Sequence, residues 1–398
     1  MMGDGMDQAA DSIAESINGL LKWVDHSYEG WDPFDGLNSG RFDHFQKMPN
    51  FLKILLIQFN KISPLNIRPV LSIEPGIDTK GVSLFLQSYC RLHESGVSSP
   101  LTEDGPFLFS RLMKESIQTD NTISWSSHYF DYIGVDGSIL TPHTSDLIGT
   151  SNAIKALCQY SRYQDFDIEG IIRKYHNFLK ESFDRDHQCY RYGHFIGNKY
   201  VPNCDAEVIS SIHYANQITK NDEINDLCLI SLKKLIETQN KDGSWFYSYY
   251  HDGLSRKQLD FHQGYIIDGL IDSLEIFPDM KIEIIGSIKE AVKSYDSIFS
   301  DEGRGYYRFP RRYPTDIHNQ AQGMITYLRL YEFSNDKKFL DMSKKICSWT
   351  IENMQDSKGY FHYQKGRVFS NRIPYMRWSE AWMMLALSQI LGSIRTEF

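Results

Sequence analysis

The sequence predicts an all-α fold: an (α/α)6 toroid, a closed ring of six helical hairpins, with aromatic-rich loops and short β-hairpins on one rim. The first observation behind this prediction is a repeat. A polar patch, a small residue and an apolar helical run recur five times, with the small residues 57, 58, 57 and 60 positions apart. Such a period is typical of one supersecondary unit arranged in an array. The repeats start at residues 146–149, 203–206, 261–264, 318–321 and 378–381, and a sixth start, at Lys80 and Gly81, lies further upstream.

The second observation is that two kinds of helical pattern alternate along the chain. One kind is amphipathic, as in 223–239, where Ile and Leu fall on one face and Lys and Glu mostly on the other. The other kind follows each repeat start and is apolar nearly all round, which indicates burial on most faces. We therefore expect outer helices near 7–24, 106–118, 166–182, 223–239, 282–299 and 337–354. Inner helices are expected near 80–94, 146–163, 204–218, 262–277, 319–333 and 379–392, with an additional helix at 51–61.

Six such pairs favour a closed toroid over an open α-solenoid, because the sequence has no polar repeat that would cap an open end. Each pair needs its neighbours to bury its apolar face, so residues 1–398 are predicted to form a single domain. The connections from outer to inner helices run over roughly 20 to 25 residues, and long loops are usually functional. They carry many Tyr, Trp and His residues, as in 189–194, 244–251 and 359–364. The sequence thus predicts one elaborate, functional rim.

Composition excludes several classes of function. The net charge of −9 argues against a nucleic-acid partner. We expect a cytoplasmic protein, because residues 1–15 lack the apolar stretch of a secretory signal and no apolar run is long enough to span a membrane. The six cysteines contain no CxxC pair and are expected to be reduced. Zinc-binding, P-loop and dinucleotide motifs are missing, so neither a metal nor a cofactor is predicted, and the oligomeric state is left open.

The candidate site consists of polar residues at or just before the inner helices, which a toroid would gather around one mouth. Helix N-termini would point there and favour an anionic ligand, while arginines would grip a carboxylate at two points. Tyr and Trp rings offer flat surfaces with polar tips that match sugar rings. The predicted catalytic residues are Asp260, His262, His318, Tyr375 and Glu380. The predicted substrate-binding residues are Asp146, Asn203, Trp245, Arg308, Gln320, Arg377 and Trp378.

Each of these residues also has a structural interpretation. Asp146, Asn203 and Asp260 are suitable helix N-caps. Trp245 ends a Gln-x-x-x-Gly-x-aromatic pattern that recurs at 355–361, where glycine would cap a helix and the aromatic ring would cover its end. Arg377 is placed to pair with Glu380 one helical turn away. The cluster nevertheless contains more His, Arg and Trp than capping requires.

Segments 31–39, 313–322 and 375–382, together with 242–245 and 260–265, resemble signatures of a bacterial and archaeal family of exopolysaccharide-biosynthesis proteins with a six-hairpin fold. The resemblance covers nearly the whole chain. More distantly, the architecture is similar to the helical domain of glucuronyl C5-epimerases, to unsaturated-uronyl hydrolases and to terpene cyclases. The zinc ligands of lanthionine synthetase-like proteins and the Asp-x-Asp-Asp motif of class II terpene cyclases are missing here.

The leading hypothesis is an enzyme of surface-polysaccharide metabolism that acts on an oligo- or polysaccharide with an anionic, uronate-type sugar. Two reactions remain open: epimerisation or elimination at the carbon next to a carboxylate, and glycoside hydrolysis by a pair of carboxylates. A different class of function is also open, that of a non-catalytic glycan-binding or scaffold protein of polysaccharide biosynthesis. A third hypothesis is a terpene cyclase-like enzyme.

Overall fold

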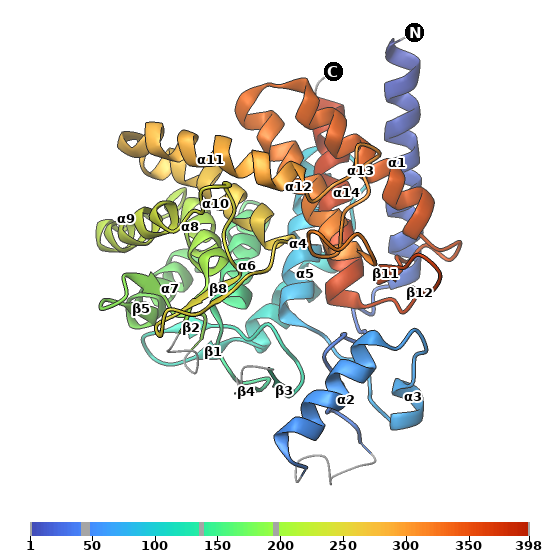
Figure 1. Ribbon diagram of the computed structural model, residues 1–398, viewed down its shortest axis with the longest axis horizontal. Helices are drawn as coiled ribbons and strands as arrows, with labels where there is room; N and C mark the ends of the chain where they lie inside the picture. The colour runs from blue at the N-terminus through green and yellow to red at the C-terminus, as the bar shows by residue number, and fades with distance from the viewer. Residues whose placement is uncertain (1, 41–47, 135–138, 194–198, 397–398) are drawn as a thin grey trace.

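The computed structural model describes residues 2–40, 48–134, 139–193 and 199–396 of the chain, with side chains from residue 9 to 395. Within these ranges, long outer and inner helices alternate along the chain (Figure 1). The outer helices are α1 (Met2–Val24), α5 (Leu101–Lys114), α7 (Ile168–Ser182), α9 (Asp222–Glu237), α11 (Lys281–Asp296) and α13 (Lys337–Met354). The inner helices are α4 (Thr79–Glu94), α6 (Leu147–Tyr160), α8 (Pro202–Asn216), α10 (His262–Ile276), α12 (Ile317–Ser334) and α14 (Trp382–Thr396).

The inner helices form a closed ring. Each packs against the next in chain order, and α14 returns to pack against α4, so the first and last repeats touch. Their surfaces are buried nearly all round, as the sequence predicted; in α12 every residue from Ile317 to Leu328 is buried. The (α/α)6 toroid expected from the repeat is therefore confirmed.

Each outer helix packs on the inner helix that precedes it, from α5 on α4 to α13 on α12. The N-terminal helix α1 completes the outer layer by packing on α14, the last inner helix. Gln355 fixes this closure, because its Nε2 donates to Ser16 O at 3.0 Å and to Gly359 O at 2.9 Å. Gly359 has a φ of +101°, and a Cβ there would lie 2.1 Å from Gly19 O, so only glycine fits. Gln239 and Gly243 repeat the arrangement two units earlier.

Some helix boundaries differ from the sequence predictions. Helix α5 begins at Leu101 rather than near 106, and Pro106 lies inside it, one turn after its start. The last inner helix is preceded by a π-helix, η3 (Met376–Ala381), which the 3.6-residue pattern does not reveal. A short 3-10 helix, η2 (Pro278–Met280), precedes α11. All six cysteines are buried free thiols, as expected.

Short β-ribbons and two extra helices build the elaborate rim, at the end where the inner helices begin (Figure 1). The helices are α2 (Asn50–Ile62) and α3 (Arg68–Leu71). The two-stranded ribbons pair β1 (Ile117–Gln118) with β2 (Ile123–Ser124), β3 (Tyr132–Ile133) with β4 (Ile139–Leu140), and β5 (Phe183–Asp184) with β6 (Cys189–Tyr190). The three-stranded sheets are β7 (Lys199–Tyr200), β8 (Ser248–Tyr250), β9 (Ser255–Arg256) and β10 (Thr315–Asp316), β11 (Gln364–Lys365), β12 (Ser370–Asn371). In the described residues, no helix has the length and hydropathy needed to cross a membrane.

Candidate active site

A cavity of about 450 Å³ lies at this rim; we call it the loop-side cavity. All six inner-helix starts contribute to its wall, and α2 covers one side with Gln58, Lys61 and Ile62. The contributions from the helix starts are Lys80, Ile148, Asn203, His262, His318 and, from η3, Arg377 with Trp378. The toroid thus brings together side chains from six repeats that are far apart in sequence.

Seven of the twelve sequence-predicted site residues line the loop-side cavity. They are Asn203, Asp260, His262, Arg308, His318, Arg377 and Trp378. Trp378 donates its indole N–H to Asp316 Oδ1 at 3.0 Å, which fixes the ring at the cavity wall.

The other five predicted residues make structural contacts and do not line the cavity. Asp146 caps α6, accepting from Gly149 N at 2.7 Å and Ser127 N at 2.6 Å. Trp245 is buried and donates to Leu235 O at 2.8 Å. Tyr375 is buried beneath the guanidinium of Arg68, which lies 4.9 Å from its ring centre.

Gln320 and Glu380 belong to a repeated staple. The residue directly before the small residue of a repeat accepts the backbone N–H of the preceding loop. Gln320 accepts from Gly305 N at 2.6 Å, and Glu380 accepts from Phe361 N at 3.0 Å. Asp205 and Gln263 do the same for Tyr190 N and Trp245 N, both at 2.9 Å. Part of the polar pattern at the repeat starts therefore ties loops to inner helices.

His262 and Asp260 form a dyad on the cavity wall. His262 Nδ1 lies 2.5 Å from Asp260 Oδ1, and the backbone N–H of His262 donates to the same oxygen at 3.2 Å. Burial alone would raise the pKa of Asp260, but the adjacent His262 holds it below its usual range. The carboxylate is therefore ionised and orients the imidazole. With Nδ1 occupied, Nε2 is the ring nitrogen that can exchange a proton with a ligand.

His318 is held in a different environment. Its ring stacks on Phe261 with centroids 4.3 Å apart, and its Nε2 shares a hydrogen bond of 2.5 Å with the Tyr265 hydroxyl. Burial, followed by the nearby Lys80, His262 and Arg377, holds the pKa of His318 well below its usual range. Burial also holds the pKa of Tyr265 well above its usual range. The pair is therefore neutral, and the tyrosine keeps its proton.

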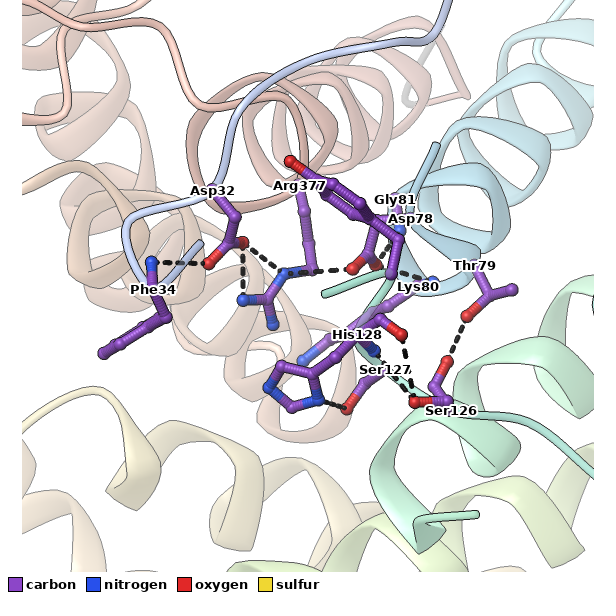
Figure 2. Close-up of polar contacts among 12 residues, drawn as sticks. Asp32, Phe34, Asp78, Thr79, Lys80, Gly81, Ser126, Ser127, His128 and Arg377 are labelled. Atoms are coloured by element: carbon purple, nitrogen blue, oxygen red, sulfur yellow. Dashed lines mark hydrogen bonds and ion pairs between the residues drawn. The ribbon is translucent and has the colours of Figure 1, made fainter. Parts of the chain in front are cut away.

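Arg377 lines the cavity and links segments near the two ends of the chain through its contacts with Asp32 and Asp78 (Figure 2). Its Nε donates to Asp32 Oδ2 at 2.8 Å, its Nη2 lies 2.6 Å from the same oxygen, and Nε lies 3.5 Å from Asp78 Oδ2. Asp78 also caps α4, accepting from Lys80 N and Gly81 N. Burial raises the pKa of Asp78 to about 7, against the opposing effect of Arg377. Arg377 therefore does not pair with Glu380.

Two lysines, Lys61 and Lys80, also line the cavity. Among the described residues, neither Lys80 Nζ nor Lys61 Nζ makes a hydrogen bond or ion pair. Lys80 Nζ lies 5.0 Å from the ring centre of Trp382, and Lys61 Nζ lies 4.4 Å from that of Phe34. Burial is the main cause that lowers the pKa of each to about 8. Asp316 opposes this effect at Lys61 and Glu207 opposes it at Lys80, while nearby arginines add to it.

Several of these residues were not predicted from the sequence. Lys80 opens the sixth repeat, and a lysine at the start of an otherwise apolar inner helix is the signal that marks it. His128 also lines the cavity, and burial, followed by Arg377 and Lys80, holds its pKa well below its usual range. Nothing in the repeat points to Asp32 or His128, because both lie in loops outside the periodic segments.

The charge of the cavity is opposite to that of the whole chain. Among the described residues that line it, five are cationic and two are carboxylates. The cationic residues are Lys61, Lys80, Arg256, Arg308 and Arg377, and the carboxylates are Asp260 and Asp316. Asp32 and Asp78 pair with Arg377, whereas neither lysine forms an ion pair with a described residue. An anionic ligand would compensate them. Over the described residues, no group of three or more His, Cys, Asp or Glu side chains is arranged to hold a metal ion.

No protein-family model and no curated protein matches this chain by sequence. Solved structures match its fold. The GH76 α-mannanase of Bacteroides thetaiotaomicron aligns with a TM-score of 0.65 and 13% identity, covering 92% of this chain and 100% of the mannanase. Cellobiose 2-epimerase of Bacillus thermoamylovorans aligns with a TM-score of 0.62 and 10% identity, covering 82% and 90%. Unsaturated glucuronyl hydrolase of Bacillus sp. GL1 aligns with a TM-score of 0.50 and 14% identity, covering 61% and 72%. At these identities, the comparisons show the shared toroid.

Proposed function

We propose that this protein is a carbohydrate-active enzyme that transfers a proton at a carbon next to a carbonyl group of an anionic sugar. The carbonyl group would be a uronate carboxylate or an open-chain aldehyde, and the outcome would be epimerisation, isomerisation or elimination. The His262–Asp260 dyad carries the proposal. It supplies an oriented imidazole on the wall of a cavity that also contains uncompensated cations. The structural neighbours, which include a sugar epimerase and two glycoside hydrolases, support carbohydrate chemistry.

The roles follow from the contacts. His262 Nε2 removes the proton, since Asp260 fixes Nδ1 and stabilises the imidazolium that forms. Lys80 and Lys61 compensate the negative charge that develops on the carbonyl oxygens. Returning a proton to the opposite face of the carbon would give epimerisation. The Tyr265–His318 pair is the candidate donor, because its tyrosine is protonated and hydrogen-bonded to an imidazole.

Hydrolysis is the second candidate, and one observation favours it. The two carboxylates of the cavity have opposite shifts: burial raises the pKa of Asp316, whereas His262 helps to lower that of Asp260. A protonated and an ionised carboxyl group are what a glycosidase requires. However, Asp316 already accepts from Gln364, Trp378 and the backbone of His318, so its oxygens are occupied. Proton transfer by His262 is therefore the better-supported reaction.

A terpene cyclase and a glycan-binding protein both fit this cavity less well. A terpene cyclase-like reaction passes through carbocations, which lysines and arginines would repel. A binding-only role gives no reason for an oriented His–Asp dyad. A place in surface-polysaccharide metabolism rests on the family resemblance of segments 31–39, 313–322 and 375–382.

The test is exchange with solvent. Uronate-containing oligosaccharides and neutral reducing sugars are incubated with the protein in D2O, and ¹H NMR follows loss of the signal at the carbon next to the carbonyl group. We expect exchange with an anionic sugar and none after His262→Gln. Release of new reducing ends without exchange would replace the proposal with hydrolysis. Binding without either change would leave a glycan-binding protein.

A further inference from the structure

Helix α2 presents an apolar stripe to solvent. Phe51, Leu55, Phe59 and Ile62 are spaced by four, four and three residues, which places them on one face. Their exposed fractions are 62%, 59%, 59% and 72%. The opposite face, with Ile57 and Asn60, is buried against the loop at Gly36. The helix is thus attached by its narrow buried face and directs its larger apolar side chains outward.

The stripe is part of a larger concentration of exposed apolar residues. Of the sixteen large hydrophobic residues that are exposed in the described chain, seven lie between residues 51 and 70. The additional members are Leu52, Leu65 and Val70. The stripe on α2 is an exposed apolar face, and such a face marks an interaction site rather than ordinary surface variation.

Charge and shape indicate the partner. The 26 residues from 48 to 73 contain no Asp or Glu, although the whole chain has 51 acidic residues and a net charge of −9. Arg68 is buried against Asp35 and Lys61 faces the cavity, so Lys53 is the basic residue of α2 left near the surface. An anionic bilayer would repel the acidic remainder of the protein but not this segment. Helices α2 and α3 also project from the rim (Figure 1). A protruding helix inserts into the fluid surface of a bilayer more easily than it packs against the same protruding helix of a second copy of the chain.

We propose that α2 docks on the surface of a lipid bilayer, with Phe51, Leu55, Phe59 and Ile62 inserted at the headgroup boundary. Its thirteen residues are too few to cross a bilayer, which needs about 20, so the helix lies in the plane of the interface. Because Gln58, Lys61 and Ile62 of the same helix line the loop-side cavity, docking brings the cavity mouth to the membrane surface. This inference does not depend on the proposed reaction.

Co-sedimentation with vesicles of equimolar phosphatidylcholine and phosphatidylglycerol tests the proposal. The variant Leu55→Ser/Phe59→Ser removes the centre of the stripe, and Leu254→Ser/Ile282→Ser is the matched control at exposed sites away from it, 66% and 85% exposed. We expect the stripe variant to lose at least about tenfold in vesicle partitioning, because each buried Leu or Phe side chain contributes strongly to insertion. The control should stay within about twofold of wild type. All three proteins should have the same circular dichroism and melting temperature.

Two results would overturn the proposal that α2 docks on a bilayer. Wild-type protein that stays in the supernatant, or a stripe variant that sediments like wild type, would exclude the bilayer as partner. Light scattering in the absence of lipid tests the competing explanation, that the stripe is a dimer interface. If wild type dimerises, the stripe variant is monomeric and neither binds vesicles, the stripe is an interface between two copies of the chain.

Discussion

The toroid has a second cavity at its other end, and comparison with the loop-side cavity shows what distinguishes a candidate site. The opposite cavity is larger, about 590 Å³ against about 450 Å³, and it lies where the inner helices end. Its charges are largely paired with each other: Lys155 Nζ lies 2.8 Å from Glu207, and Arg162 Nη1 lies 3.0 Å from Glu94. Arg329 likewise pairs with Asp272.

In the loop-side cavity, by contrast, two lysines make no ion pair with any described residue, and one imidazole is oriented by a carboxylate. Size alone would select the opposite cavity. Charged groups that are buried without an ion-pair partner indicate function better than cavity volume does, because a ligand of opposite charge can pair with them. Tyr265 lines both cavities, so the two approach each other at this side chain.

The largest expected difference is in catalysis. His262→Ala should lower the rate of solvent exchange by about 10²- to 10⁴-fold, the usual contribution of a general base. His213→Ala is the matched control, because His213 lines the opposite cavity and lies 3.5 Å from Glu275. We expect the control to stay within about twofold of wild type in NMR-monitored exchange. An equal loss of exchange activity in both variants would contradict the assignment of the reaction to the loop-side cavity.

The second-largest expected difference between the two cavities is in the free energy of unfolding. Asp32→Asn removes the main partner of a buried arginine and should lower the free energy of unfolding by about 3–5 kcal/mol. Asp272→Asn breaks the corresponding pair in the opposite cavity. Arg329 is more exposed than Arg377, so water can solvate its charge and a loss of about 1–3 kcal/mol is expected. Urea unfolding measures both. A larger loss for Asp272→Asn would contradict the view that Asp32 and Arg377 lock the two chain ends.

The uncompensated lysine predicts a pH dependence. Lys80 has a folded-state pKa of about 8, below the usual value of about 10.4. Between these values the unfolded state binds the proton and the folded state does not, so wild-type stability rises with pH. Lys80→Met lacks this contribution. It should therefore be more stable than wild type at pH 7, by about 3 kcal/mol, and lose that advantage between about pH 8 and 10.4.

Lys155→Met is the control, since Lys155 is paired with Glu207 and its loss leaves a carboxylate without a partner. It should destabilise the protein at pH 7, as measured by urea unfolding. In wild type, binding of an anionic sugar should weaken above pH 8, where Lys80 loses its charge. A stability difference between Lys80→Met and wild type that does not vary with pH would rule out an uncompensated charge at this position.

The repeat was sufficient to predict the architecture, because burial on all faces and an even period leave few arrangements besides a closed ring. The packing of α1 on α14 could not be predicted from it, since α1 lies outside the regular spacing and its partner is at the other end of the chain. The π-helix at Met376 was also hidden, because a 3.6-residue apolar pattern does not distinguish one π-helical turn from the start of an α-helix.

The position of the loop-side cavity at the inner-helix starts could be predicted, but only part of its lining could. At the last four repeat starts, the residue directly before the small residue turns toward the loop, as Gln263 does. The cavity-lining residue stands two to four positions before the small residue, as His262 and His318 do. Both positions are polar, so one sequence cannot tell them apart without the helical phase. That phase is set by packing against neighbouring helices, which a single repeat does not reveal.

Glu380 allows the smallest and most specific test. The sequence predicts a catalytic role for it, whereas in the structure its carboxyl group ties a loop to an inner helix. Burial holds the pKa of Glu380 well above its usual range, and its carboxyl group accepts from Phe361 N. At equivalent positions, Gln263 and Gln320 accept the corresponding backbone N–H with a neutral amide oxygen. Glu380→Gln should therefore keep activity within about twofold, whereas Glu380→Ala leaves a buried N–H unpaired and should cost about 1–3 kcal/mol of stability.

The pH dependence of Glu380→Gln has a definite sign. Above the usual pKa of a glutamate, the unfolded state releases a proton that the folded wild type retains, so wild-type stability falls as pH rises. The glutamine variant has no such proton. Its melting temperature relative to wild type should therefore increase from pH 5 to pH 8, as scanning calorimetry can measure. A loss of exchange activity of about a hundredfold in Glu380→Gln, at unchanged stability, would instead assign this carboxyl group to the chemistry.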